Sequence, residues 1–401
     1  MRLISVKNHE KPIRHQGFVK ETNIKQIFDL ILEHGRISRV EISKKNKLSR
    51  AAVSMLVDEL TKAGLVTIAG EGSSVSSGRK PIMLEINKDR AQIITLSLKK
   101  QSFTYVLFDL KGNEIETFSK KIVYKTGYAK KIRESILEKS PRLDVNKLLA
   151  LCVTIPAKLN VSEKTINLSV LDIQGGCDLL AELKAVWPDI PLVAGNLSSA
   201  YAYAEYKYAY GGKINNMIFF YIDDGVGAGV LMNGRVFTSE IGHMSIDAEG
   251  PVCDCGKRGC VERMVGKTAL LREFEQAGGI GPNAGYDTIR KALEKGDKQI
   301  VRISEQISGK IALCISNVIC MFTPEELVVG GGIELLGKVF LDMIARRIEL
   351  PGEKGVCSDK RPHISYSRIR EHAEAKGAFR YFLDNILTIT AETENKIYCW
   401  N

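Results

Sequence analysis

Four side chains of metal-binding type lie within 18 residues of one another: His243, Cys253, Cys255 and Cys260. Three thiolates and one imidazole make the full tetrahedral ligand set of a zinc ion. Because no position would stay open, the pattern indicates a structural metal, one per chain, rather than a catalytic one. Two alternatives remain. The thiols could be buried without metal, or form a redox pair, which the single residue between Cys253 and Cys255 disfavours.

A second chemical signal is a cluster of basic side chains near the N-terminus. Residues 1–90 carry 17 Lys and Arg against 10 Asp and Glu, a net charge of +7, whereas the other 311 residues carry 40 against 37. Such a cluster suits a polyanion, because each basic side chain that meets a phosphate releases a counterion. The alternative is a solvated basic face. The densest part of the cluster contains Arg39, Lys44, Lys45, Lys47 and Arg50.

The elements that carry this cluster follow the pattern of a winged helix-turn-helix. Apolar residues at i, i+3, i+4, i+7 and i+8 predict an amphipathic helix over residues 24–32. Ser38 and Ser49 stand where helix caps are expected, so two further short helices follow. Three short helices before a hairpin are typical of winged DNA-binding domains. The predicted wing consists of two strands and a Gly- and Ser-rich loop, at residues 65–69, 82–86 and 70–78.

The third predicted helix is the one expected to enter the major groove of DNA. It would direct Arg50, Ala51 and Ser54 towards base edges. Arg79 and Lys80, beside the wing, would reach phosphates or a narrow minor groove. The alternative for this segment is a three-helix protein-interaction module. The predicted DNA-binding residues are Arg39, Ser49, Arg50, Ala51, Ser54, Arg79 and Lys80.

The composition limits the class of protein. A chain of 401 residues predicts two or three domains, and 44% hydrophobic with 26% charged residues is typical of a globular protein. No apolar run approaches the roughly 20 residues that span a bilayer. The first 30 residues contain no apolar segment of the kind found in secretory signals, so we expect no such signal. Nine cysteines, an odd number, disfavour a disulfide framework. We therefore expect a reduced, cytoplasmic protein.

Several of these segments resemble the ROK family (repressors, open reading frames and sugar kinases). Within that family, an N-terminal winged domain marks the regulators, because the kinases generally lack it. The stretch from His243 to Cys260, continued to Glu262, is similar to the family's zinc signature, where the metal orders a loop beside the sugar pocket. In the winged domain the resemblance lies in Asn23, the runs 35–39 and 48–54, and residues 78–81.

The resemblance implies an α/β fold: the winged helix-turn-helix is followed by a two-lobed, actin-like (ribonuclease-H-like) ATPase-fold domain from about residue 90 to 385. Residues 92–123 and 216–238 each predict three strands with a turn, a repeat that suits this fold. The glycine triplet 330–332 resembles the family's adenosine-side turn. The expected divisions are a flexible arm (1–20), the winged domain (21–88), the ROK domain (89–387) and a loosely attached tail (388–401). Within the ROK domain we expect a smaller lobe (89–195 with a closing helix, 370–387) and a larger lobe (196–369).

Family positions that hydrogen-bond the hydroxyls of a sugar are matched here by four residues: Asn196, Glu240, His243 and Glu262. The resemblance therefore implies a sugar or sugar-phosphate ligand. For the two glutamates the alternative is a role as ordinary surface carboxylates.

Three departures from the ROK kinases predict that the chain is not an enzyme and does not use ATP. Residues 97–102 contain no glycine where the kinases have an Asp-x-Gly-Gly-Thr phosphate loop, so the backbone cannot approach a phosphate closely. Asp223 and Asp224 stand in the second phosphate loop, where their carboxylates would repel phosphate oxygens. Leu197 replaces the catalytic aspartate and has no proton acceptor.

Together these patterns predict a transcription regulator, a repressor of carbohydrate metabolism genes. It would bind a double-stranded DNA operator as a homodimer, with a tetramer left open, and its kinase-like domain would sense the sugar. Leu197 leaves one serious alternative, a ligand-blind regulator whose ROK domain is only a scaffold. An active sugar kinase is the other alternative.

Overall fold

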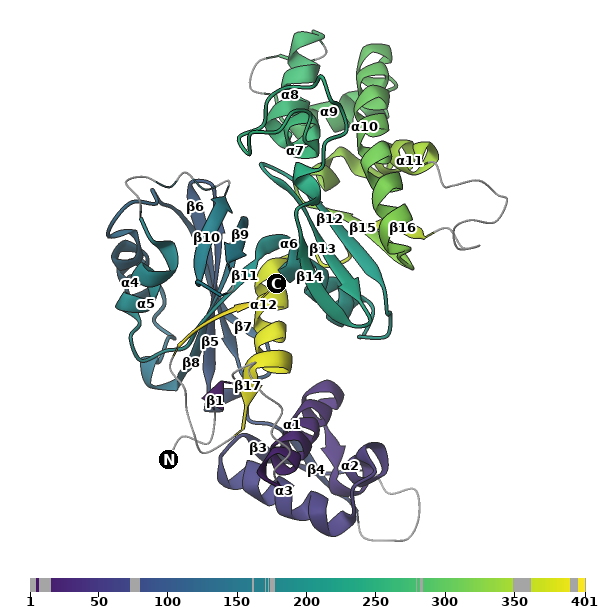
Figure 1. The fold of residues 1–401 in the computed structure, drawn as a ribbon. Coiled ribbons are helices and arrows are strands. Elements are labelled where there is room, and N and C mark those ends of the chain that lie inside the picture. The colour runs from purple at the N-terminus through teal and green to yellow at the C-terminus, as the bar shows by residue number, and fades with distance from the viewer. Residues whose placement is uncertain are drawn as a thin grey trace.

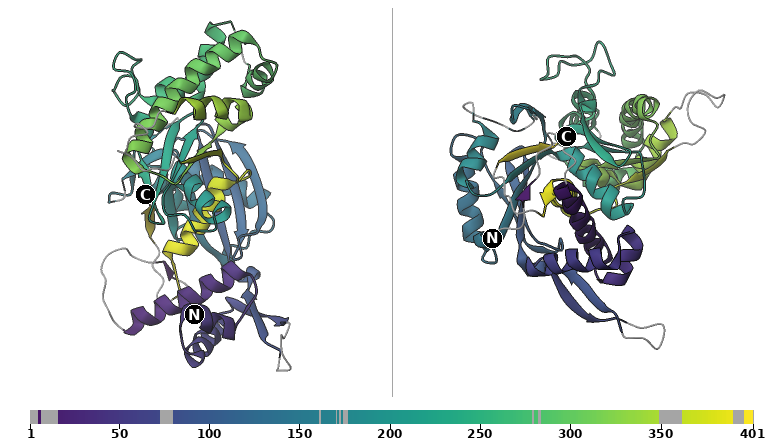
Figure 2. Two further views of the ribbon diagram at one scale, coloured as in Figure 1. Left: turned by 90° about the vertical axis from the view of Figure 1, so that its right-hand side faces the viewer. Right: turned by 60° about the horizontal axis from the view of Figure 1, so that its bottom comes forward.

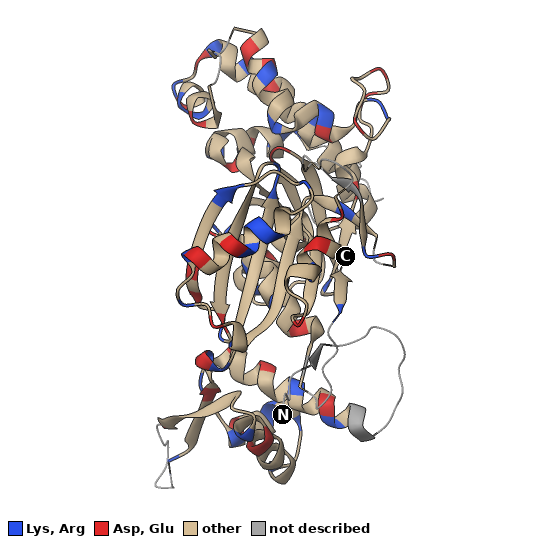
Figure 3. Cartoon of the chain, turned by 90° about the vertical axis from the view of Figure 1, so that its left-hand side faces the viewer, with Lys and Arg blue, Asp and Glu red and all other residues tan. Residues whose placement is uncertain are grey.

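The protein, described here by a computed structural model, consists of a small N-terminal unit and two α/β lobes (Figure 1). The N-terminal unit lies at one end, below the first lobe and helix α12, which is drawn in yellow (Figure 2). Lys and Arg residues occur in all three parts (Figure 3). The structure describes residues 5–6, 16–72, 80–160, 162–169, 171, 173, 177–278, 280–281, 284–348, 362–389 and 396–400.

The N-terminal unit is a winged helix-turn-helix, as predicted. Ser38 caps α2 in a reciprocal box with Glu41, and the Ser49 side chain accepts a hydrogen bond from the backbone of Ala52 at the start of α3. The wing strand β3 continues to Glu71, beyond the predicted range. The helices are α1 (Gln16–His34), α2 (Arg39–Asn46) and α3 (Arg50–Lys62). The three-stranded sheet has the order β2 (Ile37–Ser38), β4 (Ile82–Ile86) and β3 (Val66–Glu71).

The predicted flexible arm over residues 1–20 is wrong at two points. Ser5–Val6 forms β1, which pairs antiparallel with β17 (Leu387–Thr388). Helix α1 begins at Gln16, because residues 18–23 contain no proline or glycine to end the helix before the apolar pattern starts. The strand partner lies near the other end of the chain and leaves no local sign in the sequence, so β1 could not be predicted.

The first lobe contains a six-stranded sheet, in which three neighbouring strand pairs are parallel and two are antiparallel. Helices α4 (Tyr128–Lys139) and α5 (Leu179–Val186) pack on one face, and α12 (Ala373–Tyr381) packs on the other. The strand order is β18 (Ile397–Trp400), β11 (Leu192–Asn196), β8 (Leu148–Ile155), β5 (Gln92–Lys99), β6 (Ser102–Asp109) and β7 (Glu114–Lys121). Beside it lie the hairpin β9 (Ala157–Asn160) and β10 (Thr165–Ser169) and the short 3-10 turns η1 (Lys88–Arg90) and η2 (Val145–Lys147).

The C-terminal tail is not loosely attached, contrary to the prediction. Strand β18 pairs parallel with β11 at the edge of the sheet, and its Trp400 is only 3% exposed and stacks on Tyr381 at 3.9 Å between ring centroids. A side chain at Gly195 would overlap the indole of Trp400, so glycine makes this approach possible. The physical reason is the apolar content of residues 397–400, which are buried once they reach the sheet edge.

The second lobe repeats the three-strand unit of the first, which confirms the predicted repeat. Among the described residues, five helices cover one face of its sheet and α6 (Leu197–Ala204) covers the other, continued by a π-helical turn η3 (Glu205–Ala209). The strand order is β14 (Arg235–Ser239), β13 (Val226–Met232), β12 (Met217–Ile222), β15 (Glu326–Gly330) and β16 (His363–Tyr366). The five helices are α7 (Val261–Val265), α8 (Lys267–Gln276), α9 (Tyr286–Glu294), α10 (Lys298–Phe322) and α11 (Gly337–Arg347). Two 3-10 turns, η4 (Ile241–His243) and η5 (Gly332–Leu336), complete this lobe.

Helices α6 and α12 lie against each other between the two sheets and join the lobes (Figure 1). Gly377 of α12 makes this contact possible, because a side chain there would lie 1.8 Å from the carbonyl oxygen of Ala200. Helix α12 ends in a π-helical turn, η6 (Phe382–Ile386), which packs on the winged domain in one continuous apolar core. In the part of the chain that the structure describes, no helix has the length and apolarity of a membrane span.

Candidate functional site

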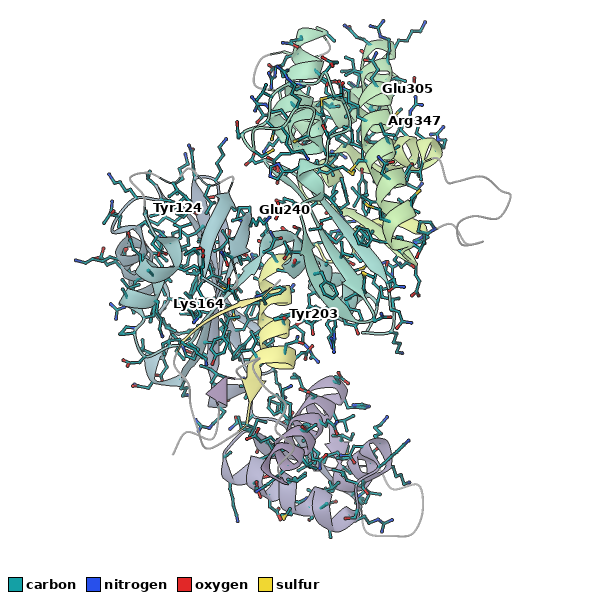
Figure 4. The ribbon with its side chains drawn as sticks, in the orientation of Figure 1. Tyr124, Lys164, Tyr203, Glu240, Glu305 and Arg347 are labelled. Atoms are coloured by element: carbon teal, nitrogen blue, oxygen red, sulfur yellow. The ribbon has the colours of Figure 1, made fainter. Side chains whose placement is uncertain are left out.

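A cleft of about 430 Å³ separates the two lobes, and α6 begins at its floor. Residues 156–158 line it from the first lobe, and the loop after β14 lines it from the second. Glu240 lies where the lobes face each other (Figure 4). The structure brings together in this one cleft all four residues predicted to bind hydroxyls: Asn196, Glu240, His243 and Glu262.

Asn196 already uses most of its hydrogen-bonding capacity inside the protein. Its side-chain oxygen accepts hydrogen bonds from the backbone of Ser198 and Ser199 and from the Ser198 hydroxyl, and so caps α6. Its amide nitrogen donates to the carbonyl oxygen of Ala157 at 2.9 Å. One amide hydrogen is left for a ligand, so the main role of Asn196 is to fix the floor of the cleft.

Leu197 follows directly, as the first residue of α6, and lines the cleft while only 5% exposed. An aspartate at this point could accept a proton from a hydroxyl bound in the cleft, whereas leucine presents only methyl groups.

Glu262 is held at the start of α7 with its carboxylate towards the cleft. One carboxylate oxygen accepts a hydrogen bond from the backbone of Val226 at 3.0 Å. Burial raises the pKa of this carboxyl group above its usual value, against the lowering effect of the Val226 hydrogen bond. Gly242 lets the loop of Glu240 and His243 approach β13, because a side chain there would lie 1.9 Å from the carbonyl oxygen of Val226.

The acidic pair Asp223 and Asp224 has a basic partner that the sequence patterns did not predict. The Lys267 ammonium lies 3.7 Å from the Asp223 carboxylate and 3.9 Å from that of Asp224, and its backbone nitrogen donates to the carbonyl oxygen of Asp223. Burial raises the pKa of Asp223, and Lys267 opposes that shift. One ammonium for two carboxylates leaves a net negative charge, so the expected repulsion of a phosphate is weakened but not removed. The sequence signal for this ion pair was a lysine in the first turn of α8, a position where acidic side chains are normally favoured.

The four predicted metal ligands meet beside the cleft, with all donor atoms within 4.8 Å of one another. The Cys255 and Cys260 sulfurs are 3.6 Å apart, and the Cys253 sulfur is 3.7 Å from Nδ1 of His243. A tetrahedral zinc ion with Zn–S bonds of about 2.3 Å needs sulfurs about 3.8 Å apart. The donor types and spacing therefore fit zinc. Gly259 has a φ of 59° and lies against Asp247, which closes the loop tightly around the ligands.

Replacing Cys255 by serine is expected to release about one metal ion per chain and to loosen the loop between His243 and Cys260. The physical reason is that a neutral hydroxyl is a much poorer zinc ligand than a thiolate. Elemental analysis of the purified protein measures the metal, and Cys320→Ser, an exposed thiol on α10, is the matched control. Unchanged metal content in the Cys255 variant would refute the zinc site.

The predicted DNA-binding residues divide into two groups in the structure. Arg39 donates to the Ser54 hydroxyl and pairs with Asp58 at 2.7 Å, so it ties α2 to α3. Ser49 caps α3, and together these contacts give Arg39, Ser49 and Ser54 internal roles. Lys80 is exposed beside the wing and lies 3.8 Å from Glu71, whereas Arg79 lies outside the described residues.

Arg50 and Ala51 are exposed at the start of α3, where a recognition helix meets DNA. Met55, one turn further along the helix, is 54% exposed and was not predicted. An apolar side chain at this point can contact the methyl group of a thymine. Its exposed apolar character, opposite the buried face of an amphipathic helix, was the signal in the sequence.

The comparison with known proteins agrees with this arrangement. The sequence pattern of the ROK family matches residues 99–385, which is more than half of the chain. The chain belongs to the ROK family. A winged helix-turn-helix DNA-binding pattern matches residues 20–67, ahead of the ROK domain. The predicted fold class, a winged helix-turn-helix followed by a two-lobed ROK domain, is confirmed.

Two curated relatives are similar to this chain over most of their length. One is a putative xylose repressor of Caldicellulosiruptor sp. (strain Rt8B.4), 29% identical over 83% of this chain and 88% of the relative. The other is the DNA-binding transcriptional dual regulator NagC of Escherichia coli (strain K12), 25% identical over 94% and 96%. A solved ROK family transcriptional regulator, a homolog of the E. coli MLC protein, has a TM-score of 0.74 and 22% identity over 91% and 97%. That structure supports the fold.

Proposed function

We propose that the protein is a transcriptional repressor of carbohydrate metabolism genes that releases DNA when a sugar or sugar phosphate enters the cleft. The observation that carries the proposal is that one helix, α12, packs against α6 at the cleft floor and, through η6, against the winged domain. The relatives named as repressors support the DNA-binding part. The hydroxyl-binding set around the cleft supports the sensing part.

A chain of contacts leads from the cleft to the first end of α12. Tyr221 lines the cleft and stacks on Tyr201 of α6 at 5.2 Å between ring centroids. Burial raises the pKa of the Tyr201 hydroxyl, and the nearby carboxylate of Glu374, which is buried in the first turn of α12, raises it further. Movement of one lobe towards the other would therefore be transmitted to α12.

The other end of α12 holds the winged domain. Arg380 pairs with Asp384 at 2.9 Å and with Glu33 of α1 at 3.3 Å. Asp384 also accepts a hydrogen bond from Tyr203 and pairs with Lys207. Burial raises the pKa of Asp384, but Arg380 and Lys207 outweigh this and hold that pKa below its usual value. A ligand that favours one lobe arrangement would shift the position of the winged domain by differential affinity.

The same cleft is unsuited to phosphoryl transfer. Leu197 supplies no general base, and Asp223 and Asp224 carry more charge than Lys267 neutralises. We therefore propose that the domain binds its ligand without ATP and without turnover. The cluster of three cysteines and one histidine would hold one structural zinc ion, which would fix the loop that presents His243 to the cleft.

We further propose that the protein binds DNA as a homodimer. Two recognition helices related by two-fold symmetry would meet half-sites about one helical turn apart, or a multiple of it, in a roughly palindromic operator. The ligand would change the spacing of the two winged domains.

Replacing Arg50 by alanine is expected to weaken specific operator binding by about 1–3 kcal/mol, because Arg50 is exposed where α3 meets base edges. Fluorescence anisotropy on the operator and on a random duplex measures the effect. Lys62→Ala, at the opposite end of α3, is the matched control. An equal loss on random DNA would reassign Arg50 to a phosphate contact.

A ligand-blind regulator is the second candidate, because Leu197 and the occupied side chain of Asn196 both weaken the sugar site. One experiment separates the two. Fluorescence anisotropy of the protein on its own upstream DNA, at about 150 mM salt and against a random duplex, is followed by a panel of sugars and sugar phosphates. Specific binding that one compound releases supports the sensor. Specific binding that no compound releases supports the scaffold, and equal affinity for both duplexes contradicts a regulator of its own promoter.

A further inference from the structure

A second hollow, of about 630 Å³, lies on the first lobe and is lined by lysines. It is bounded by the turn between β5 and β6, by the segment that follows β7, and by α4. It shares a single lining residue, Lys100, with the cleft between the lobes. The five lysines are Lys100, Lys120, Lys121, Lys125 and Lys131.

The backbone under these lysines is tied together by hydrogen bonds. The hydroxyl of Tyr124, which is fully buried, donates to the carbonyl oxygens of Lys99 and Ser102 at 2.8 and 2.6 Å. The backbone nitrogen of Ile122 donates to the carbonyl oxygen of Gln101 at 3.0 Å. The turn and the segment after β7 are therefore held at a fixed distance, so the lysines on them converge on one hollow.

These lysines have few partners of their own. Among the described residues, no carboxylate lies within 4.0 Å of any of the five ammonium groups. Lys120 donates a hydrogen bond to the buried hydroxyl of Ser135 at 2.8 Å. Two acidic side chains, Glu134 and Glu138, also line the hollow, so its net charge is +3. Unpaired cations that converge on one hollow attract a multivalent anion.

The position of the hollow disfavours the operator as that anion. Tyr124, whose neighbours in sequence line the hollow, lies at the end of the first lobe that points away from the winged domain (Figure 4). DNA that contacts α3 would approach from the opposite end (Figure 1). A concave hollow of this volume is within the usual range of small-molecule sites, about 300–1,000 Å³.

We propose that this hollow is a binding site for a small molecule that carries two or more phosphate groups. Each phosphate group brings a charge of about −1.5 to −2 at pH 7, so two together balance the net charge of +3, whereas one does not. The site lies apart from the sugar cleft and would let a second ligand act on the first lobe. The shared residue Lys100 gives that ligand a direct contact with the cleft edge.

Isothermal titration of the full-length protein with inorganic pyrophosphate tests the proposal. We expect saturable binding at one site per chain in the wild type. The combined variant Lys120→Gln, Lys125→Gln, Lys131→Gln should bind about tenfold more weakly, because exposed ion pairs are individually weak but add when they converge. The matched control is Lys44→Gln, Lys45→Gln, Lys47→Gln in the winged domain, which should bind as the wild type does. Any heat that arises because pyrophosphate chelates the zinc would be the same for all three proteins, so it would not affect the comparison.

Equal binding of pyrophosphate by the wild type and the Lys120 triple variant would overturn the proposal. So would full competition by sulfate at the same ionic strength, since screening is then constant and the result would indicate a site for any divalent anion rather than for two phosphate groups. A loss of operator affinity in the Lys120 triple variant, without any pyrophosphate binding by the wild type, would also overturn it and assign these lysines to DNA. None of these results depends on whether a sugar binds in the cleft.

Discussion

Replacing Glu262 by alanine is expected to abolish the release of DNA by sugar while operator affinity without sugar stays unchanged. A hydrogen bond from a sugar hydroxyl to a carboxylate contributes about 1.5–3 kcal/mol, which is roughly 10- to 150-fold in ligand affinity. The side chain also holds the backbone nitrogen of Val226 at 3.0 Å, and this amide would lose its acceptor. Calorimetry with the releasing compound measures ligand affinity, and anisotropy on the operator measures release.

Two further variants make this result specific. Glu262→Gln keeps an oxygen for Val226 and removes only the charge, so it should retain the loop and lose part of the ligand affinity. Glu249→Ala, exposed on the same segment between His243 and Cys253, should behave as the wild type. Metal content should stay at one ion per chain in all of them. Normal release by Glu262→Ala would contradict a sugar site at this residue and favour the scaffold.

The sequence predicted those elements whose formation depends only on residues that are close together in the chain. Ser38 and Ser49 cap their helices as expected, because a cap depends only on the next three or four residues. Helix α10 likewise begins directly after Asp297, whose side chain caps it, and ends at Phe322. The predicted metal ligands meet for the same reason, since all four lie on one short segment.

Features that depend on distant segments were missed. Strand β18 is too short to be recognised from four residues, and its burial depends on Gly195 in a strand 200 residues earlier. The ion pair between Lys267 and the acidic loop joins residues more than 40 positions apart. Asn196 was predicted as a ligand residue, yet its hydrogen bonds to Ala157 and Ser198 become visible only when the strands are assembled.

The contact between α12 and the winged domain also depends on segments that are distant in sequence, and Arg380 lies at its centre. Its side chain and that of Asp384 are each only 11% exposed, and Glu33 of α1 is its second partner. Replacement by methionine keeps the aliphatic stem and removes the charge. We expect the free energy of unfolding to fall by about 3 kcal/mol, near the lower end for a broken buried pair, because Lys207 still compensates Asp384.

In functional assays, Arg380→Met should keep sugar binding but lose the release of DNA by sugar. The cleft residues are untouched, so the variant should bind sugar with normal affinity. Sugar should no longer release the operator, because the ion pair between α12 and Glu33 of α1 is lost. Denaturant unfolding, calorimetry and operator anisotropy measure the three quantities. Arg346→Met, exposed at the end of α11, is the matched control.

Glu33→Gln provides the decisive comparison if Arg380→Met is too unstable to purify. Glu33 is half-exposed and belongs to the winged domain, where it pairs with Arg380 of α12. Its replacement therefore leaves the pair of Arg380 and Asp384 intact. We expect less than about 1 kcal/mol of destabilisation, as for other exposed pairs, together with a weaker release by sugar. If both variants release DNA as the wild type does, the signal does not pass through this contact, and the shared apolar core between η6 and α1 would be the remaining route.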